Sequence, residues 1–256
     1  MKITFLGTGS SSGTPVPTCS CHVCTSRSSK DRRYRPSLLV ESNGKTLVID
    51  APQELRLQLV KHKVMKIDCM LITHCHADHV YGLDDVRIYC REKKLPVYAD
   101  SDTVNELKKI FPYVFRRTQK SGGKPRLQLT RVDKPFSTAG FSVIPLPVFH
   151  GGKKIFGWRI GGVAYIPDTS RIPESTFRLL EDLDIFILDG LRKEPHPTHI
   201  TLGDAVKIAE RVGAGKTYFT HISHNLQHKK TDAELPKGMH LAFDGLVLKT
   251  EGVRIG

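Results

Sequence analysis

The amino-acid sequence predicts an α/β (α+β) fold, and three observations lead to this prediction. Short apolar runs of strand length alternate with segments of helical periodicity, and a β-rich pattern recurs in the second half. The 256 residues are enough to bury a sizeable core. The sequence shows no internal repeat and no linker long enough to separate domains. We therefore expect a single domain over residues 1–256.

The predicted strands are short and are bounded by turn residues. They lie at residues 2–6, 37–40, 46–49, 69–72, 97–99, 141–148, 155–160, 163–166, 185–188 and 217–219. Helical patterns lie at residues 54–61, 103–109, 174–180 and 202–212. Pro173 precedes the third of these and suits a first helical turn. An exposed turn is expected at residues 118–124, which contain Ser121-Gly122-Gly123.

A dense group of metal-ligand side chains follows the strand predicted at residues 69–72. The run His74-Cys75-His76-Ala77-Asp78-His79 places three imidazoles and one carboxylate within six residues. Divalent cations such as zinc favour imidazole nitrogen and carboxylate oxygen. Open α/β sheets place their sites at the carboxyl ends of strands. The run therefore predicts a metal centre at the edge of a sheet.

Further motifs occur along the whole chain in a recognisable order. The chain opens with an apolar strand and a glycine turn, Ile3-Thr4-Phe5-Leu6-Gly7-Thr8-Gly9. His150, Asp168 and His221 each end or follow a later apolar strand. Together with the histidine run, these motifs resemble those of the metallo-β-lactamase-fold hydrolases. The resemblance implies a four-layer αβ/βα metallo-β-lactamase sandwich with a two-metal site along one edge.

The resemblance also divides the ligands between two divalent metals, manganese or zinc. The first set comprises His74, His76 and His150, and the second comprises Asp78, His79 and His221. Asp168 is expected to bridge them, because a shared carboxylate stabilises two cations roughly 3.5–4 Å apart. Such a pair lowers the pKa of water and stabilises charge on a phosphate. Asp50, after the strand at residues 46–49, either orients a metal-bound histidine or caps a turn.

A second metal motif lies in Cys19-Ser20-Cys21-His22-Val23-Cys24. Cysteines at such short spacing, in a chain with no export signal, favour metal binding over disulfides. The three thiolates need one more ligand to close a tetrahedral zinc site. We expect His224 to supply it, with His22 and His228 as alternatives, because His224 lies three residues beyond His221. A structural zinc is therefore expected on a loop of about residues 15–30.

The cysteine motif narrows the resemblance. Cys19, Cys21, Cys24 and His224, with the opening glycine turn, resemble those of the phosphodiesterases of the carbon–phosphorus lyase pathway. This implies an enzyme, a metal-dependent phosphoric diester hydrolase that opens 5-phosphoribosyl 1,2-cyclic phosphate to ribose 1,5-bisphosphate. That subgroup has a catalytic histidine where this chain has His199, and an imidazole can protonate a leaving alkoxide at neutral pH.

Asp168 is the second residue expected to act in catalysis, because it would hold the metal pair together. His196, three residues before His199, is expected to be an ordinary surface histidine.

Two other functions remain open. A tRNA 3′-processing endonuclease shares the glycine turn, the histidine run and a basic charge balance. That family usually binds tRNA through a long arm, and the candidate arm here, residues 111–126, is short. The cysteine spacing also resembles that of the pyrroloquinoline quinone biosynthesis protein B. An accessory role in quinone cofactor biosynthesis is therefore the second alternative.

Composition bounds the partners and the location. Lys and Arg number 39 against 26 Asp and Glu, which gives a formal net charge of +13 and favours anionic partners. We expect a small phosphorylated substrate, with nucleic acid as the alternative and a homodimer left open. The sequence contains no apolar run of 18 residues and no secretory apolar segment. We therefore expect no membrane partner and a cytoplasmic protein.

Overall fold

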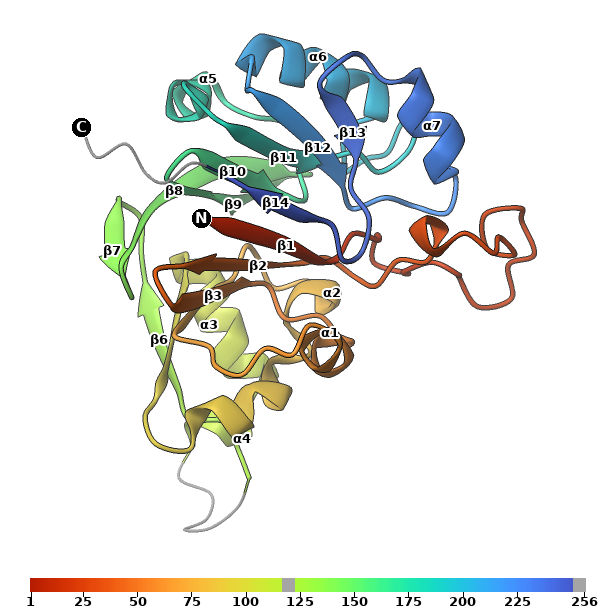
Figure 1. Cartoon of the computed structure of the whole chain (residues 1–256). Coiled ribbons are helices and arrows are strands. Elements are labelled where there is room, and N and C mark those ends of the chain that lie inside the picture. Colours follow the sequence, from red (N-terminus) through yellow and green to blue (C-terminus); the bar gives the residue numbers. More distant parts are fainter. Residues whose placement is uncertain (117–122, 251–256) are drawn as a thin grey trace.

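The computed structural model describes residues 1–116 and 123–250, which form two mixed seven-stranded sheets packed face to face (Figure 1). The first sheet has the order β14-β1-β2-β3-β4-β5-β6. Its strands are β1 (Lys2–Gly7), β2 (Ser37–Ser42), β3 (Lys45–Ile49), β4 (Cys69–Leu71), β5 (Leu95–Ala99), β6 (Leu127–Arg131) and β14 (Val247–Lys249).

The second sheet has the order β13-β12-β11-β10-β9-β8-β7. Its strands are β7 (Phe136–Thr138), β8 (Phe141–His150), β9 (Lys153–Ile160), β10 (Val163–Ile166), β11 (Ile185–Asp189), β12 (Lys216–Thr220) and β13 (Met239–Leu241). Strands β10, β11, β12 and β13 pair in parallel, as do β3, β4, β5 and β6. Parallel neighbours bring their carboxyl ends to one edge of each sheet.

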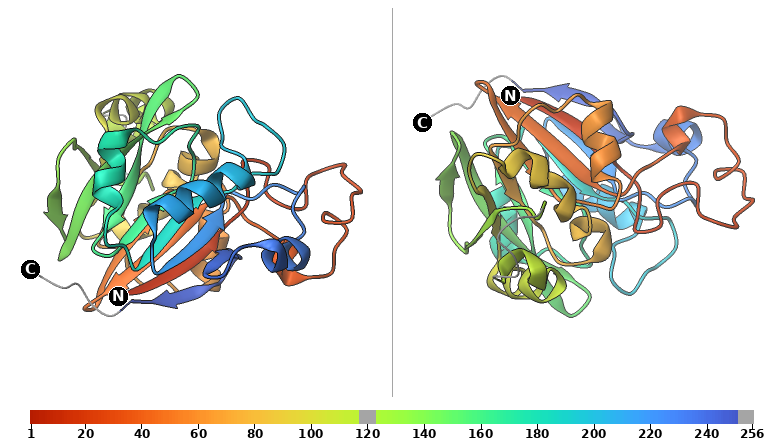
Figure 2. Two further views of the ribbon diagram at one scale, coloured as in Figure 1. Left: turned by 90° about the horizontal axis from the view of Figure 1, so that it is seen from above. Right: turned by 90° about the horizontal axis from the view of Figure 1, so that it is seen from below.

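Helices cover the outer face of each sheet (Figures 1 and 2). Those of the first half are α1 (Leu55–Lys61), α2 (Ala77–Val80), the 3₁₀ helix η2 (Leu83–Cys90), α3 (Ser101–Ile110) and α4 (Pro112–Phe115). Those of the second half are α5 (Glu174–Phe177), η3 (Arg178–Leu180), α6 (Leu202–Val212) and α7 (His228–Glu234). A further short turn, η1 (Ser29–Asp31), lies in the long loop between β1 and β2.

Three apolar layers hold the four layers of backbone together. Strand β3 shows why: Leu47 and Ile49 pack between the sheets, whereas Val48 faces the helices of the first half. Side chains alternate along a strand, so a sheet covered on both faces is apolar on both. Trp158 and Phe5 lie fully buried between the sheets. Burial of each such side chain contributes about 1.5–3 kcal/mol.

All ten predicted strands are present, with ends within two residues of those expected. The predicted helix at residues 202–212 has the same bounds as α6, and the one at 174–180 is divided into α5 and η3. The four strands that the sequence did not predict, β6, β7, β13 and β14, are the four edges of the two sheets. Most of the turn expected at residues 118–124 lies outside the described residues. Among the residues described, no helix has the length and apolarity needed to cross a membrane.

Candidate metal centres

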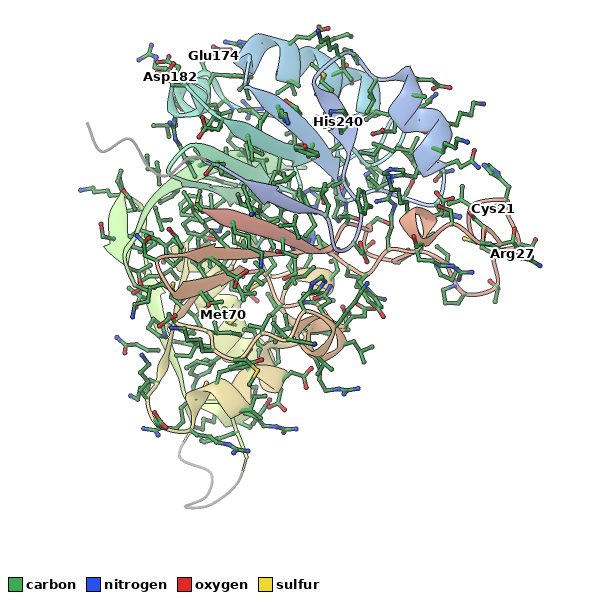
Figure 3. The ribbon with its side chains drawn as sticks, in the orientation of Figure 1. Cys21, Arg27, Met70, Glu174, Asp182 and His240 are labelled. Atoms are coloured by element: carbon green, nitrogen blue, oxygen red, sulfur yellow. The ribbon has the colours of Figure 1, made fainter. Side chains whose placement is uncertain are left out.

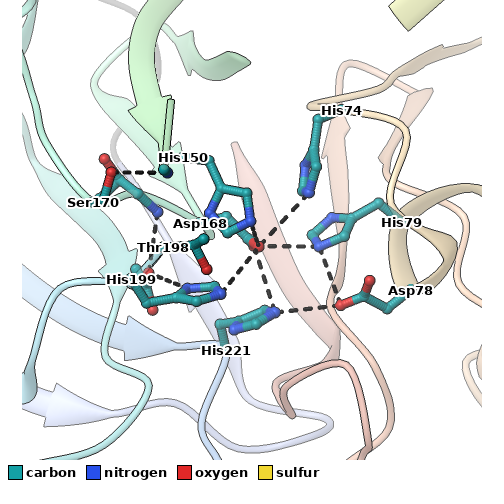
Figure 4. A network of polar contacts seen from close by, with 12 residues as sticks. His74, Asp78, His79, His150, Asp168, Ser170, Thr198, His199 and His221 are labelled. Carbon is teal, nitrogen blue, oxygen red and sulfur yellow. Dashed lines mark hydrogen bonds and ion pairs between the residues drawn. The ribbon is translucent and has the colours of Figure 1, made fainter. Parts of the chain in front are cut away.

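Residues 74–79 form the turn and the short helix that follow β4 (Figure 4). His74 follows the strand end, His76 is the N-cap of α2, and Asp78 and His79 lie within that helix. The rings of His76 and His79 approach the ring of His74 to 4.5 and 4.2 Å between centroids. His74, Asp78 and His79 are buried, whereas His76 is exposed. The turn and the helix therefore bring the three imidazoles of the run together.

The second half supplies three further side chains from the carboxyl ends of its strands. His150 is the last residue of β8, Asp168 follows β10, and His221 follows β12. His221 adopts φ of +56°, a left-handed conformation that a residue with a side chain rarely takes. Its neighbour Ile222 is held by backbone hydrogen bonds to the opening glycine turn. Strained backbone of this kind clusters at functional sites, where the surrounding structure imposes it.

Asp168 lies between two groups of histidines and offers one carboxylate oxygen to each (Figure 4). Its Oδ1 lies 3.2 Å from His79 Nε2 and 3.5 Å from His221 Nε2. Its Oδ2 lies 3.7 Å from His74 Nε2 and 3.9 Å from His150 Nε2. This is the position that a carboxylate bridging two cations would take.

The remaining two expected ligands complete the groups. Asp78 Oδ2 lies 3.3 Å from His221 Nε2 and 3.5 Å from His79 Nε2. The ring of His76 lies 4.9 Å from that of His150. Within each group the ligand atoms lie within 4.8 Å of one another, in His74, His76, His150 and Asp168 and in Asp78, His79 and His221. The structure thus brings together the seven residues that the sequence predicted for the centre.

The donor set fits metal ions because several of its buried atoms have no hydrogen-bond partner among the described residues. These atoms are Nε2 of His74, Nε2 of His79 and Oδ1 of Asp168. Each unpaired buried polar group costs about 1–3 kcal/mol, and cations between the histidines would satisfy all three. Burial alone would raise the pKa of Asp168, but His221 and His79 outweigh it and hold that pKa well below its usual value. The side chain of Asp168 is therefore a charged carboxylate.

Asp50 directs His79 toward the centre. Its Oδ2 lies 2.8 Å from His79 Nδ1, and its two oxygens also accept hydrogen bonds from the backbone N–H and hydroxyl of Thr73. A histidine that donates Nδ1–H to a carboxylate presents a basic Nε2 to a metal. Of the two roles predicted for Asp50, this contact corresponds to orienting a histidine rather than to capping a turn.

His199 lies beside the centre and has a carboxylate partner of its own. Its Nδ1 lies 2.7 Å from Asp189 Oδ2, and its Nε2 lies 3.9 Å from Asp168 Oδ2. Its ring stacks on that of His221 at 4.8 Å between centroids. Asp189 is buried and also accepts the backbone N–H of Thr169 at 3.0 Å. The imidazole is thus held in one orientation with Nε2 facing the centre.

Asp189 is a site residue that the sequence analysis missed. It ends the apolar strand Ile185-Phe186-Ile187-Leu188, just as Asp50 follows Leu47-Val48-Ile49. The same signal, an acid directly after a buried strand, could have identified both residues.

The three predicted cysteines meet one imidazole nitrogen. Cys19, Cys21 and Cys24 place their Sγ atoms 3.3, 3.5 and 3.5 Å from His224 Nδ1. Tetrahedral zinc, with Zn–S of about 2.3 Å and Zn–N of about 2.0 Å, requires sulfur and nitrogen about 3.5 Å apart. The backbone N–H of Cys24 donates to Cys21 Sγ and, with His224 nearby, lowers the pKa of Cys21 to about 6. A thiolate is therefore available at neutral pH.

The cysteine group lies on the loop between β1 and β2, which projects from the sheets, and Figure 3 shows Cys21 on it. Of the two alternative ligands, His228 is buried with its Nδ1 3.1 Å from an Arg33 nitrogen, and His22 is exposed. Neither belongs to the group of Cys19, Cys21, Cys24 and His224.

Comparisons with known proteins identify the family of this chain. A family model described as "Beta-lactamase superfamily domain" matches residues 45–222. The crystal structure of a "new diphosphatase from the PhnP family" is 42% identical, with a TM-score of 0.92 and coverage of 98% of both chains. The structure of Zn²⁺-bound PqqB from Methylobacterium extorquens is 20% identical with a TM-score of 0.82, over 98% of this chain and 100% of that one. At that identity the likeness shows the fold alone.

A curated relative, an octanoyltransferase of Porphyromonas gingivalis, is 34% identical over 262 residues. The match includes the whole of this chain, which spans only 53% of that relative.

The family match covers most of the chain, so this protein belongs to the β-lactamase superfamily. Its identity to the PhnP-family structure over nearly the whole chain places it, within that superfamily, among the PhnP-family metallo-hydrolases. The metallo-β-lactamase fold predicted from the sequence is confirmed.

Proposed function

We propose that this protein is a metal-dependent phosphodiesterase that hydrolyses small cyclic phosphates, with 5-phosphoribosyl 1,2-cyclic phosphate as its substrate. The observation that carries the proposal is the carboxylate of Asp168, which faces two histidine groups and also His199. The two ligand groups would hold manganese or zinc. Such ions supply Lewis acidity, which polarises a phosphate and lowers the pKa of water.

The residues around the centre have separable tasks. Asp168 fixes the separation of the two ligand groups, and Asp50 orients His79. His199 has its Nδ1 engaged by Asp189, so only Nε2 can exchange a proton with a substrate. With its side chain 8% exposed, it lies where a leaving alkoxide can receive that proton. Asp189 holds the ring so that Nε2 faces the leaving oxygen.

Further parts of the proposal concern the whole chain. We place the protein in the cytoplasm as one domain with a structural zinc on the cysteine loop. Its six cysteines lie in the described residues and form no disulfide there, which agrees with a reducing compartment. We do not propose octanoyl transfer for this chain, because the chain matches only 53% of the length of the octanoyltransferase.

A substrate panel tests the proposal. Protein loaded with manganese or with zinc would be assayed on 5-phosphoribosyl 1,2-cyclic phosphate, 2′,3′-cyclic nucleotides, bis(p-nitrophenyl) phosphate and precursor tRNA. We expect kcat/KM to be highest for the phosphoribosyl substrate, by roughly 100-fold over bis(p-nitrophenyl) phosphate. Preferred cleavage of precursor tRNA, or hydrolysis of no phosphodiester by protein with its metals bound, would overturn it.

A further inference from the structure

The loop that joins β11 to α6 lies at the surface and is hydrogen-bonded within itself. Arg192 donates from Nε to the carbonyl of Glu194 at 3.3 Å and from Nη2 to the carbonyl of Pro195 at 2.7 Å. Pro195 and Pro197 restrict the backbone on both sides of His196. These contacts restrict the conformations that the loop can adopt.

The same loop is anchored beside the metal centre. The backbone N–H of Ile200 donates to the carbonyl of Thr169 at 2.8 Å. Gly151, which follows the ligand His150, packs so closely that an added Cβ would lie 3.1 Å from Thr198 Cγ2. The position of His196 relative to the centre is thus set by packing as well as by hydrogen bonds.

Hydrogen bonds fix the tautomer of His196. Its Nδ1 accepts the backbone N–H of Thr198 at 3.3 Å, and the hydroxyl of Thr198 lies 3.2 Å from the same atom. A nitrogen that accepts an N–H carries no proton, so the neutral ring holds its proton on Nε2. Burial, with His199 and Arg192 nearby, lowers the pKa of His196, which keeps the ring neutral. Within residues 1–116 and 123–250, no protein group is hydrogen-bonded to that Nε2.

His196 lies one ring further from the metal ligands than His199 does. The ring of His199 is 4.6 Å from that of His150, 4.8 Å from that of His221 and 5.0 Å from that of His196. No ring contact joins His196 to a metal ligand in the described part of the chain. A phosphate bound at the centre, with its leaving oxygen at His199, would extend the rest of its leaving group toward His196.

We propose that His196 binds the leaving group, by donating Nε2–H to an oxygen of a phosphate that the leaving group carries. The proposal rests on the proposed function, because it takes His199 as the residue that protonates the leaving oxygen. The neutral ring of His196 presents its Nε2–H as a hydrogen-bond donor, which recognises an acceptor. In a chain of net charge +13 an anionic acceptor is favoured. His196 is therefore a specificity residue for doubly phosphorylated small substrates, rather than an ordinary surface histidine.

A two-by-two experiment tests this role. Wild type and His196→Leu would be assayed on ribosyl 1,2-cyclic phosphate with and without the 5-phosphate, and metal content would be measured in both proteins. Loss of a hydrogen bond to an anion should lower kcat/KM on the 5-phosphorylated substrate by about 10- to 100-fold, mostly through KM. The loss on the unphosphorylated substrate should stay within about threefold, the scatter of a surface substitution.

Two further variants separate binding from structure. His196→Gln keeps an N–H donor and should restore part of the lost kcat/KM. His240→Leu replaces another half-buried histidine, on β13, and should leave both substrates unaffected.

Each outcome of the experiment either supports or overturns the role of His196. Equal losses of His196→Leu on both substrates, or no loss on either, would overturn the role of His196 while leaving the phosphodiesterase intact. A wild-type enzyme that prefers the unphosphorylated sugar would also overturn it. Wild-type protein that contains its metals and hydrolyses neither these substrates nor bis(p-nitrophenyl) phosphate would instead remove the proposed function, and this proposal with it.

Discussion

Each half of the molecule contains a buried aspartate that holds a histidine, and the two pairs differ in their surroundings. Asp50 follows β3 and lies 2.8 Å from His79 Nδ1, while Asp189 ends β11 and lies 2.7 Å from His199 Nδ1. The orienting contact is the same. The surroundings of Nε2 differ. The Nε2 atom of His79, in a fully buried ring, lies 3.2 Å from Oδ1 of Asp168, whereas the Nε2 atom of His199 lies 3.9 Å from Oδ2.

The difference fits the two roles that we propose, a metal ligand for His79 and a proton donor for His199. Burial would lower the pKa of His79, but Asp168, Asp78 and Asp50 outweigh it and raise that pKa well above its usual value. Two of these carboxylates, Asp168 and Asp78, lie beside Nε2 of His79, and their negative charge there is suited to a cation. His199 has one tightly bound carboxylate and a path to solvent, which suits proton exchange.

The largest expected effect comes from Asp168→Ala, which removes the carboxylate that both pairs face. We expect metal content to fall from about three equivalents to about one, that of the cysteine site. Activity on every phosphodiester should fall by at least about 10⁴-fold. Elemental analysis and assays on two leaving groups measure this. Retention of both metals by the variant would show that Asp168 does not bridge them.

His199→Ala tests whether the second pair supplies a proton. With both metals retained, the rate on a substrate with a poor alkoxide leaving group should fall by roughly 10²–10⁴-fold. The loss should shrink sharply with p-nitrophenyl phosphodiesters, whose leaving group departs without protonation. Equal losses on both substrates would make His199 a phosphate-binding residue, and loss of a metal would make it a ligand.

Asp50→Asn and Asp189→Asn compare the two orienting carboxylates directly. Asp50→Asn should weaken metal affinity by roughly 10- to 100-fold and leave the dependence on leaving group unchanged. Asp189→Asn should retain the metals and slow only substrates with poor leaving groups, by a comparable factor. Metal titrations and leaving-group series on both variants separate the two. If both variants lost metal alike, the two pairs would have the same role.

Cys21→Ser should have the smallest effect on the chemistry, because the cysteine site lies outside both pairs. The variant should release its zinc and unfold at a lower temperature, since a structural zinc contributes directly to folding. The kcat of the protein that remains folded should stay within about twofold, because a closed site has no open coordination position. An unchanged zinc content and Tm would contradict the assignment of Cys21 as a ligand.

The sequence predicted the interior of the fold better than its rim. Strands covered on both faces, such as β3 and β11, read as continuous apolar runs and were placed within two residues. The edge strand β14 is three residues long, with Val247 and Lys249 exposed, so it gave no apolar run. Helix α2 has four residues, most of them metal ligands or their neighbours, and its periodicity could not be recognised.

At the site, the sequence predicted which residues lie together but not how they are held. The two clusters of candidate metal ligands could be predicted because imidazoles and thiols at short spacing have few other uses. Asp189 was missed because a single acid after a strand is a weak signal by itself. Its partner His199 lies ten residues later, and only the fold brings the two side chains into contact. The identity of the metals, the substrate and the single domain over residues 1–256 stay predictions.

The position of Asp168 between the two sheets has a consequence for the stability of the whole molecule. Each group of ligands draws on both sheets: His74 and His76 follow β4 and meet His150 of β8, while His79 meets His221 after β12. A bound ion would therefore act as a clamp across the sandwich.

A ligand that binds only the folded chain stabilises it by mass action, by about 4 kcal/mol when its free concentration is 1,000 times Kd. The Tm should accordingly rise with the free metal concentration. A chelator should loosen both sheets in one transition, visible as a single shift of the melting curve.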